Sequence, residues 1–266
     1  MLYIAISTRN AGMKHKLLIA IIGIASVFYG CSHVYAPALY HQDIAYMPKP
    51  ASFDTNKTAA YISGGIDGHS STNYTDFLAS GQLNISVGHR FNGFNLAYGG
   101  FASFGDYSQS GSKTDSGYFG DKFFGAVGGR FSANAFITSG RADIRFIGIE
   151  MAYSHEFGSY ANYRKQINNA GGYFVDPRVD LFTIGLTTEV IFHNRNDNGF
   201  QHSIRGFLGT TLGHDPLEDT YYTTEDAGSK LFRKVFPKAS YFIKYKNYFG
   251  TAEVGNNFFI RFGYTF

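Results

Sequence analysis

From residue 57 to the end of the chain, apolar and polar side chains alternate with a period of two. The stretch FLASGQLNISVGHR at 77–90 is typical: Ala79, Leu83, Ile85 and Val87 fall on one face, and Ser80, Gln82, Asn84 and Ser86 on the other. Because successive side chains of a strand point to opposite faces, this period predicts β-strands. Nine such segments begin near residues 58, 77, 93, 119, 141, 179, 199, 238 and 253.

One segment changes its phase in the middle. In RADIRFIGIEMAYS, Ile144 and Phe146 share the apolar face, whereas Ile147, Ile149 and Met151 continue it one position out of step. An extra residue in one strand shifts the pairing by one position and restores the register. The pattern therefore predicts a β-bulge near Phe146 and Ile147.

The polar face of these strands carries too much charge for the core of a soluble sandwich. It offers Arg130, Arg145, Glu150, Glu189, Arg205, Lys244 and Arg261. The strands are also long, and short turns alternate with longer polar connections at 107–118, 157–177 and 214–236. Long strands that are apolar outside and polar inside, with turns short at one end and long at the other, are typical of a transmembrane barrel. A lipocalin-like soluble barrel has the opposite polarity.

The fold class that we predict is therefore all-β, an antiparallel, transmembrane, up-and-down β-barrel. A bacterial barrel has an even number of strands, so we expect ten, with the missing strand within 217–236, and eight as the alternative. Because an arginine that faces lipid near the bilayer midplane costs about 2–4 kcal/mol, we expect the arginines to face the interior. The predicted lumenal charge network comprises Arg130, Arg145, Glu150, Glu189, Arg205 and Arg261, with other inward acids as further partners.

Composition agrees with a β-rich chain and argues against one class of partner. There are 32 Gly, 27 Phe and 20 Tyr but no Trp, and abundant aromatic residues favour strands. The net charge of +3 comes from three basic residues in the first 30 positions; the rest has 20 basic and 20 acidic residues. A neutral body lacks the basic surface that nucleic-acid binding requires.

The first thirty residues have the pattern of a secretory signal peptide. Lys14 and Lys16 precede an apolar run of 14 residues, Leu17–Gly30. Such a run is too short to span a bilayer as a helix but has the length of a signal-peptide apolar region; a buried core helix is the alternative. The run ends at Cys31, the one cysteine of the chain, which can form no intramolecular disulfide.

The residues FYGC around that cysteine resemble the lipobox of bacterial lipoproteins, in which a small residue precedes the cysteine that is cleaved and lipidated. Gly30 and Cys31 match the motif, whereas Phe28 and Tyr29 are larger than usual. The resemblance implies lipidation at Cys31; an ordinary signal peptide cut nearby, at VYAPA, is the alternative. Residues 31–56 contain three of the six prolines and no clear period, so we interpret them as a lipidated N-terminal linker between the signal peptide (1–30) and the barrel (57–266).

The C-terminal strand FFIRFGYTF resembles the signal by which bacterial outer-membrane barrels are recognised for assembly. Phe262, Tyr264 and the terminal Phe266 carry this resemblance. With the signal peptide and the strand pattern, the chain resembles the small lipid-anchored outer-membrane barrels of Bacteroidetes-type bacteria. The resemblance implies a bacterial outer-membrane location, contact with outer-membrane lipid, and assembly by periplasmic chaperones and the barrel-assembly machinery. It brings no activity with it.

No motif in the sequence indicates a catalytic, cofactor-binding or metal-binding site. His69, His89, His155, His193, His202 and His214 sit at predicted strand ends or turns and form no close ligand pair. Ser154-His155-Glu156 and His202-Ser203 supply the residue types of a lipid-modifying hydrolase with an active site at the barrel rim, but adjacent strand residues point to opposite faces. We therefore predict a structural, surface-binding or narrow-pore role, with a surface ligand of unknown identity and the hydrolase as the alternative.

Overall fold

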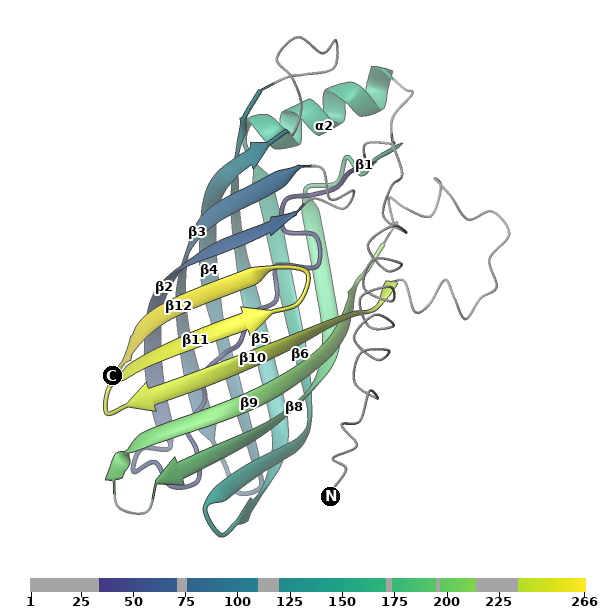
Figure 1. The fold of residues 1–266 in the computed structure, drawn as a ribbon. Coiled ribbons are helices and arrows are strands. Elements are labelled where there is room, and N and C mark those ends of the chain that lie inside the picture. The colour runs from purple at the N-terminus through teal and green to yellow at the C-terminus, as the bar shows by residue number, and fades with distance from the viewer. Residues whose placement is uncertain (1–33, 71–75, 110–119, 171–173, 195–196, 214–233) are drawn as a thin grey trace, which may run out of the picture. The chain divides into compact units, whose positions relative to one another are not determined.

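The computed structural model of the chain describes residues 34–70, 76–109, 120–170, 174–194, 197–213 and 234–266. Ten strands form one closed barrel in the order β10-β11-β12-β2-β3-β4-β5-β6-β8-β9, and each pairs antiparallel with its neighbours (Figure 1). Their bounds are β2 Thr58–Ser70, β3 Phe77–Arg90, β4 Phe94–Ser108, β5 Lys122–Ser139, β6 Ala142–Phe157, β8 Asp180–Asn194, β9 Asp197–Thr211, β10 Phe236–Tyr245, β11 Tyr248–Val254 and β12 Phe258–Thr265. The predicted antiparallel up-and-down barrel of ten strands is confirmed.

The tenth strand does not lie where the sequence placed it. We expected it within 217–236. It comes instead from a hairpin at Lys246 and Asn247, which joins β10 to β11, and both of these strands belong to the barrel. Residues 217–233 lie outside the described residues. The segment that begins near 238 is thus divided into β10 and β11, and the one that begins near 253 corresponds to β12.

The predicted β-bulge is present in β6. The pairing of β6 with β8 shifts register between Arg145 and Gly148. Phe146 and Ile147 are both exposed, whereas Arg145 and Gly148 on either side are buried. The bulge therefore lets the apolar face continue outward on both halves of a long strand.

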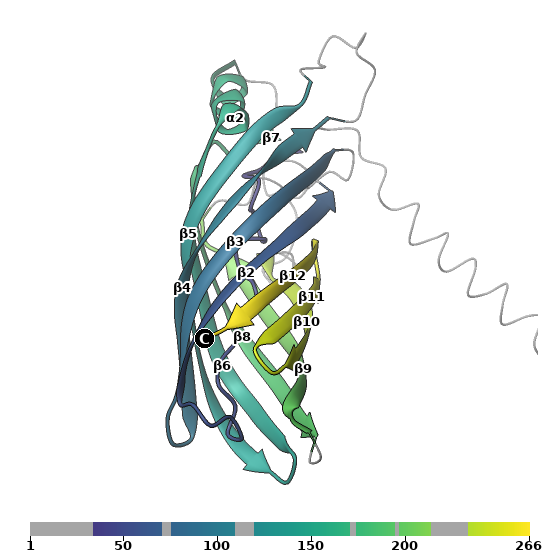
Figure 2. The same cartoon turned by 90° about the vertical axis from the view of Figure 1, so that its left-hand side faces the viewer.

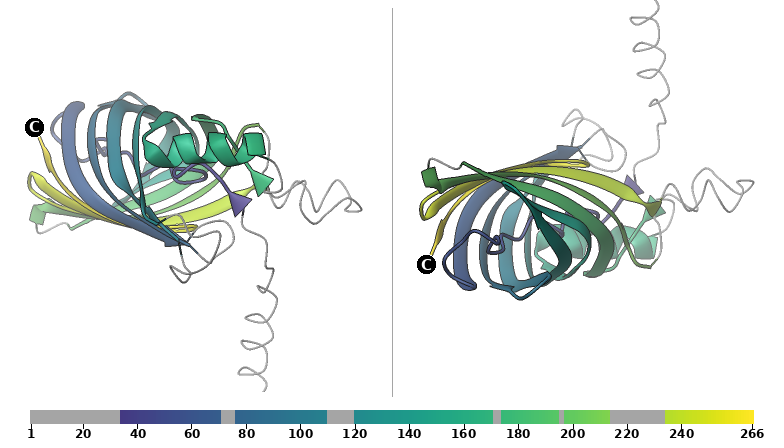
Figure 3. Two further views of the ribbon diagram at one scale, coloured as in Figure 1. Left: turned by 90° about the horizontal axis from the view of Figure 1, so that it is seen from above. Right: turned by 90° about the horizontal axis from the view of Figure 1, so that it is seen from below.

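The two ends of the barrel differ. At one end, here called the hairpin end, short turns join β3 to β4, β5 to β6 and β10 to β11. At the opposite end, here called the helix end, the connections 109–121, 158–179 and 212–235 are longer. The second of these contains α2 (Ser159–Ala170) and the short strand β7 (Phe174–Val175), where the sequence predicted only a polar connection. Figures 1 and 3 show α2 at this end, across part of the barrel opening.

The outer surface of the barrel is apolar. Large side chains that are 40–72% exposed include Ile66, Leu83, Tyr98, Leu186, Ile204 and Phe262, and they lie on strands all around the barrel (Figure 2). The buried residues include many polar and charged ones. No helix among the described residues is long and apolar enough to cross a membrane.

Candidate functional site

The lumen of the barrel is filled by the N-terminal part of the described chain. Residues 35–54, here called the lumenal segment, contain 16 consecutive positions, 36–51, of which all but Tyr40 are buried. They form no strand of the barrel. The segment appears in Figure 3 as the purple chain inside the barrel. We predicted a linker at 31–56; residues 35–51 are instead packed within the barrel, and 38–42 form hydrogen-bonded turns, so this part of the chain is not a free tether.

The path of the segment starts at the helix end. The short strand β1 (Val34–Tyr35) pairs in parallel with β7, and the Tyr160 hydroxyl of α2 donates a hydrogen bond of 2.9 Å to the Ala36 carbonyl. The Ala38 amide donates to the carboxylate of Glu156 at 2.6 Å, near the end of β6. Tyr35, Leu39, Tyr107 and Tyr160 belong to one buried cluster here.

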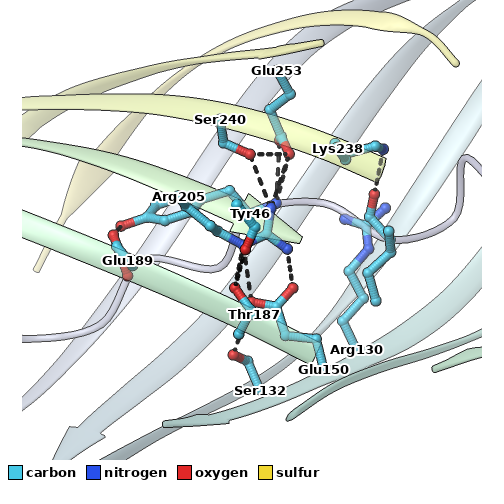
Figure 4. A network of polar contacts seen from close by, with 12 residues as sticks. Tyr46, Arg130, Ser132, Glu150, Thr187, Glu189, Arg205, Lys238, Ser240 and Glu253 are labelled. Atoms are coloured by element: carbon cyan, nitrogen blue, oxygen red, sulfur yellow. Dashed lines mark hydrogen bonds and ion pairs between the residues drawn. The ribbon is translucent and has the colours of Figure 1, made fainter. Parts of the chain in front are cut away.

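The middle of the segment is held by charged groups of the barrel wall (Figure 4). The Tyr46 amide donates to Glu253 at 3.0 Å, and the Tyr46 carbonyl accepts from Arg261 at 2.6 Å. The Tyr46 hydroxyl donates to Glu189 at 2.6 Å. One tyrosine therefore contacts three wall residues that are each no more than 2% exposed.

The flanking backbone carbonyls also satisfy cations of the wall. Arg130 Nε donates to the Asp43 carbonyl at 2.6 Å, and Lys238 Nζ donates to the Ile44 carbonyl at 2.8 Å. Arg130 completes its contacts with the side-chain oxygens of Asn84 and Gln82. Because a buried cation without a partner costs several kcal/mol, the peptide carbonyls of the segment replace acids that the wall does not provide here.

The segment ends at the hairpin end. The Ser52 amide and hydroxyl donate to Asp143, and Asp54 accepts from Gln201 and pairs with Lys244 at 3.2 Å. At Gly88 the wall lies so close that a Cβ atom would stand 2.9 Å from Pro50 Cδ. The Lys57 carbonyl then accepts from the Arg90 amide, and β2 begins.

The structure brings all six residues of the predicted charge network into the lumen. Arg145 pairs with Glu189 at 2.6 Å, and Arg205 contacts Glu150 with Nε 3.1 Å from Oε1. Arg261 pairs with Glu253 at 3.0 Å, and Arg205 Nη1 lies 3.8 Å from the same carboxylate. The hydrogen bonds of Arg130 go instead to the Asp43 carbonyl and to the amide oxygens of Asn84 and Gln82.

Sequence reasoning missed four residues that join this network: Asp43 and Tyr46 of the segment, and Lys238 and Glu253 of the wall. Asp43 is fully buried and accepts from the Thr183 hydroxyl at 2.6 Å. Glu253 shares the inward face of β11 with Thr251, and this alternation would have identified it had β11 been recognised as a strand. For the segment no periodic signal exists.

The candidate serines and histidines of the alternative hydrolase lie on opposite faces of the barrel wall. Ser154 and Glu156 face inward, where Glu156 pairs with Arg164 at 2.6 Å. His155 faces outward and pairs with Asp180 at 2.9 Å. Ser203 donates inward to Glu189, while the ring of His202 stacks on that of Phe192. Neither pair forms a nucleophile–base contact.

The described residues contain no group of three or more His, Cys, Asp or Glu side chains arranged to hold a metal ion. His214 and Cys31 lie outside the described residues. Phe262 and Phe266 are exposed on the outer face at the end of the chain, and Tyr264 is half-buried between their positions.

No protein-family model matches this chain, and no curated protein sequence matches it. Among solved structures it is similar to the translocator domain of the autotransporter NalP from Neisseria meningitidis, with 10% identity, a TM-score of 0.31, and 81% of this chain and 90% of that chain covered. A bacterial polysaccharide outer membrane secretin has 9% identity, a TM-score of 0.30, and coverage of 79% and 98%. The KdgM porin has 16% identity, a TM-score of 0.23, and coverage of 76% and 98%.

Proposed function

We propose that this protein is a bacterial outer-membrane β-barrel lipoprotein that is closed by its own lumenal segment and has a structural or surface-binding role. The observation that carries the proposal is the polarity of the wall. Phe262, Ile66 and Leu83 are 65–72% exposed on the outside, whereas Arg145, Arg205 and Arg261 are at most 2% exposed inside. In water this arrangement would expose a continuous apolar surface, which soluble monomers rarely have; in a bilayer it is the arrangement a spanning barrel requires.

The two ends of the barrel support one orientation in the membrane. Outer-membrane barrels have short turns on the periplasmic side and longer loops outside. The hairpin end then faces the periplasm, and α2 with the longer connections faces the exterior. A surface ligand, where one binds, meets the helix end.

The lumenal segment supports a closed barrel rather than a pore. A barrel of this strand number has an interior that side chains alone nearly fill, and here an additional segment crosses it. Its hydrogen bonds reach β2, β5, β6, β8, β9, β10, β11 and β12. We expect the purified protein to give no stable conductance.

The proposal also includes lipidation at Cys31. It includes as well the recognition of the C-terminal residues Phe262, Tyr264 and Phe266 during assembly. The lipid would add an anchor to a barrel that is already held by its apolar surface. Incorporation of labelled palmitate by the wild-type protein, and its loss in Cys31→Ala, tests the lipid without testing the barrel.

Planar-bilayer recordings test the closed barrel. The purified wild-type protein is compared with a variant in which residues 36–54 are replaced by a Gly/Ser segment of the same length, which cannot make the side-chain contacts of Tyr46 and Asp43. The wild-type protein should be silent and the replacement variant should conduct. Both must first show the same change in gel mobility on heating that marks a folded barrel. Steady conductance through the wild-type protein would contradict the closed lumen and favour a narrow pore.

A further inference from the structure

The lumenal segment crosses the whole barrel, and its direction is fixed at both ends. Val34 and Tyr35 pair with β7 in the connection that holds α2. Thr58 pairs with His89, next to the β3–β4 hairpin at the opposite end. The chain therefore enters the lumen at the helix end and leaves it at the hairpin end, where β2 starts.

This direction determines the side on which the chain N-terminal to Val34 continues. Cys31 is only three residues before Val34. An extended chain advances at most about 3.6 Å per residue, so Cys31 can lie no more than about 11 Å from Val34. The apolar band of an outer-membrane barrel is about 25 Å tall. The chain is too short to return to the hairpin side.

We infer that the N-terminus of the mature chain emerges on the same side of the membrane as α2, and that the lipid on Cys31 enters the outer leaflet. The lipid part of this inference rests on the proposed lipidation, and the outer side rests on the proposed orientation. The shared side of the N-terminus and α2 rests on the path of the lumenal segment alone.

The contacts along the path oppose a reversed arrangement. The segment is bound near the helix end by Glu156 and Tyr160, in the middle by Glu189, Glu253 and Arg261, and near the hairpin end by Asp143. Placing Val34 at the hairpin end would remove the segment from the lumen and break all of these contacts. The buried Arg130 and Lys238 would also lose their carbonyl partners.

Cysteine accessibility in intact cells tests the inference. Three variants are labelled with a membrane-impermeant maleimide: His33→Cys, Gln166→Cys on the exposed face of α2, and Asn92→Cys in the exposed β3–β4 hairpin. Each must show the heat-dependent change in gel mobility of the wild-type barrel. We expect His33→Cys and Gln166→Cys to be labelled in intact cells, and Asn92→Cys to be labelled only after the outer membrane is permeabilised.

The possible results distinguish the inferred path of the chain from the proposed lipidation and the proposed orientation. If His33→Cys is labelled under the same conditions as Asn92→Cys and not as Gln166→Cys, the inference is overturned, whichever side faces out. If Gln166→Cys and Asn92→Cys exchange their behaviour while His33→Cys still follows Gln166→Cys, the orientation is reversed, the outer-leaflet placement is overturned, and the threading stands. The wild-type protein is the control for Cys31, since an acylated cysteine has no free thiol. Labelling of the wild-type protein in intact cells would overturn the lipid part alone.

Discussion

Glu253 provides the sharpest test of the lumenal network, because it joins the segment to the wall. Its carboxylate accepts from the Tyr46 amide at 3.0 Å and the Ser240 hydroxyl at 3.1 Å, and it pairs with Arg261 at 3.0 Å. It is fully buried. Glu253→Gln keeps the shape of the side chain and removes its charge. In this variant Arg261 loses its ion pair and keeps its hydrogen bond to the Tyr46 carbonyl, whereas Arg205 keeps its contact with Glu150.

The expected loss follows from the uncompensated charge. Breaking a buried ion pair by removing one partner costs about 3–5 kcal/mol, a large part of the roughly 5–15 kcal/mol that stabilises a typical folded protein. Because glutamine still accepts hydrogen bonds, we expect a loss of unfolding free energy near the lower limit, about 3 kcal/mol. With a urea dependence of about 3 kcal/mol per molar, the unfolding midpoint falls by about 1 M.

Urea titrations in lipid vesicles measure this shift, with the folded fraction read from gel mobility without heating. Tyrosine emission gives a second signal, since the chain contains no tryptophan. Asp180→Asn is the matched control: it removes an acid whose side chain is 54% exposed and pairs with His155, and an exposed pair contributes no more than about 1 kcal/mol. Equal midpoints for the two variants would refute the view that the lumenal cations depend on Glu253.

Three further predictions concern the outer face, the chain end and the segment. Ile260→Arg should cost roughly 2–4 kcal/mol in the same titration, while Ile260→Leu should cost little; equal midpoints would place residue 260 away from lipid. Deletion of Phe266 should lower the amount of barrel assembled in cells without preventing refolding in vitro, and unchanged assembly would remove its signal role. Tyr46→Phe should cost about 1.5–3 kcal/mol through its hydrogen bond to Glu189, and Tyr248→Phe, on an exposed ring, should leave the midpoint unchanged.

The strands could be predicted from the sequence because each has an exposed, apolar outer face and a buried, polar inner face. In β8, Phe182 and Leu186 are exposed while Thr183 and Glu189 are buried, as the alternation predicts. The hairpin between β10 and β11 gave no comparable signal. Lys246 adopts a positive φ of 54° there, a conformation that glycine or asparagine would have indicated.

The lumenal segment could not be predicted, because its partners are distant in the sequence and follow no period. Tyr46 and Glu253 are separated by 207 residues. Its wall contacts also use backbone carbonyls, as at Asp43 and Ile44, and every residue type has one. The prolines at 48 and 50, which suggested a linker, fit a segment that joins no strand ladder.

The path of the lumenal segment also imposes an order on how the barrel forms. The last seam to become available joins β12 to β2, because β12 is at the end of the chain. The lumenal segment continues directly into β2 and runs through the interior. It must therefore lie in the lumen before this seam closes, because afterwards it would have to thread through a closed barrel. Interior and wall must therefore fold together, and the buried arginines have their partners from the moment of closure.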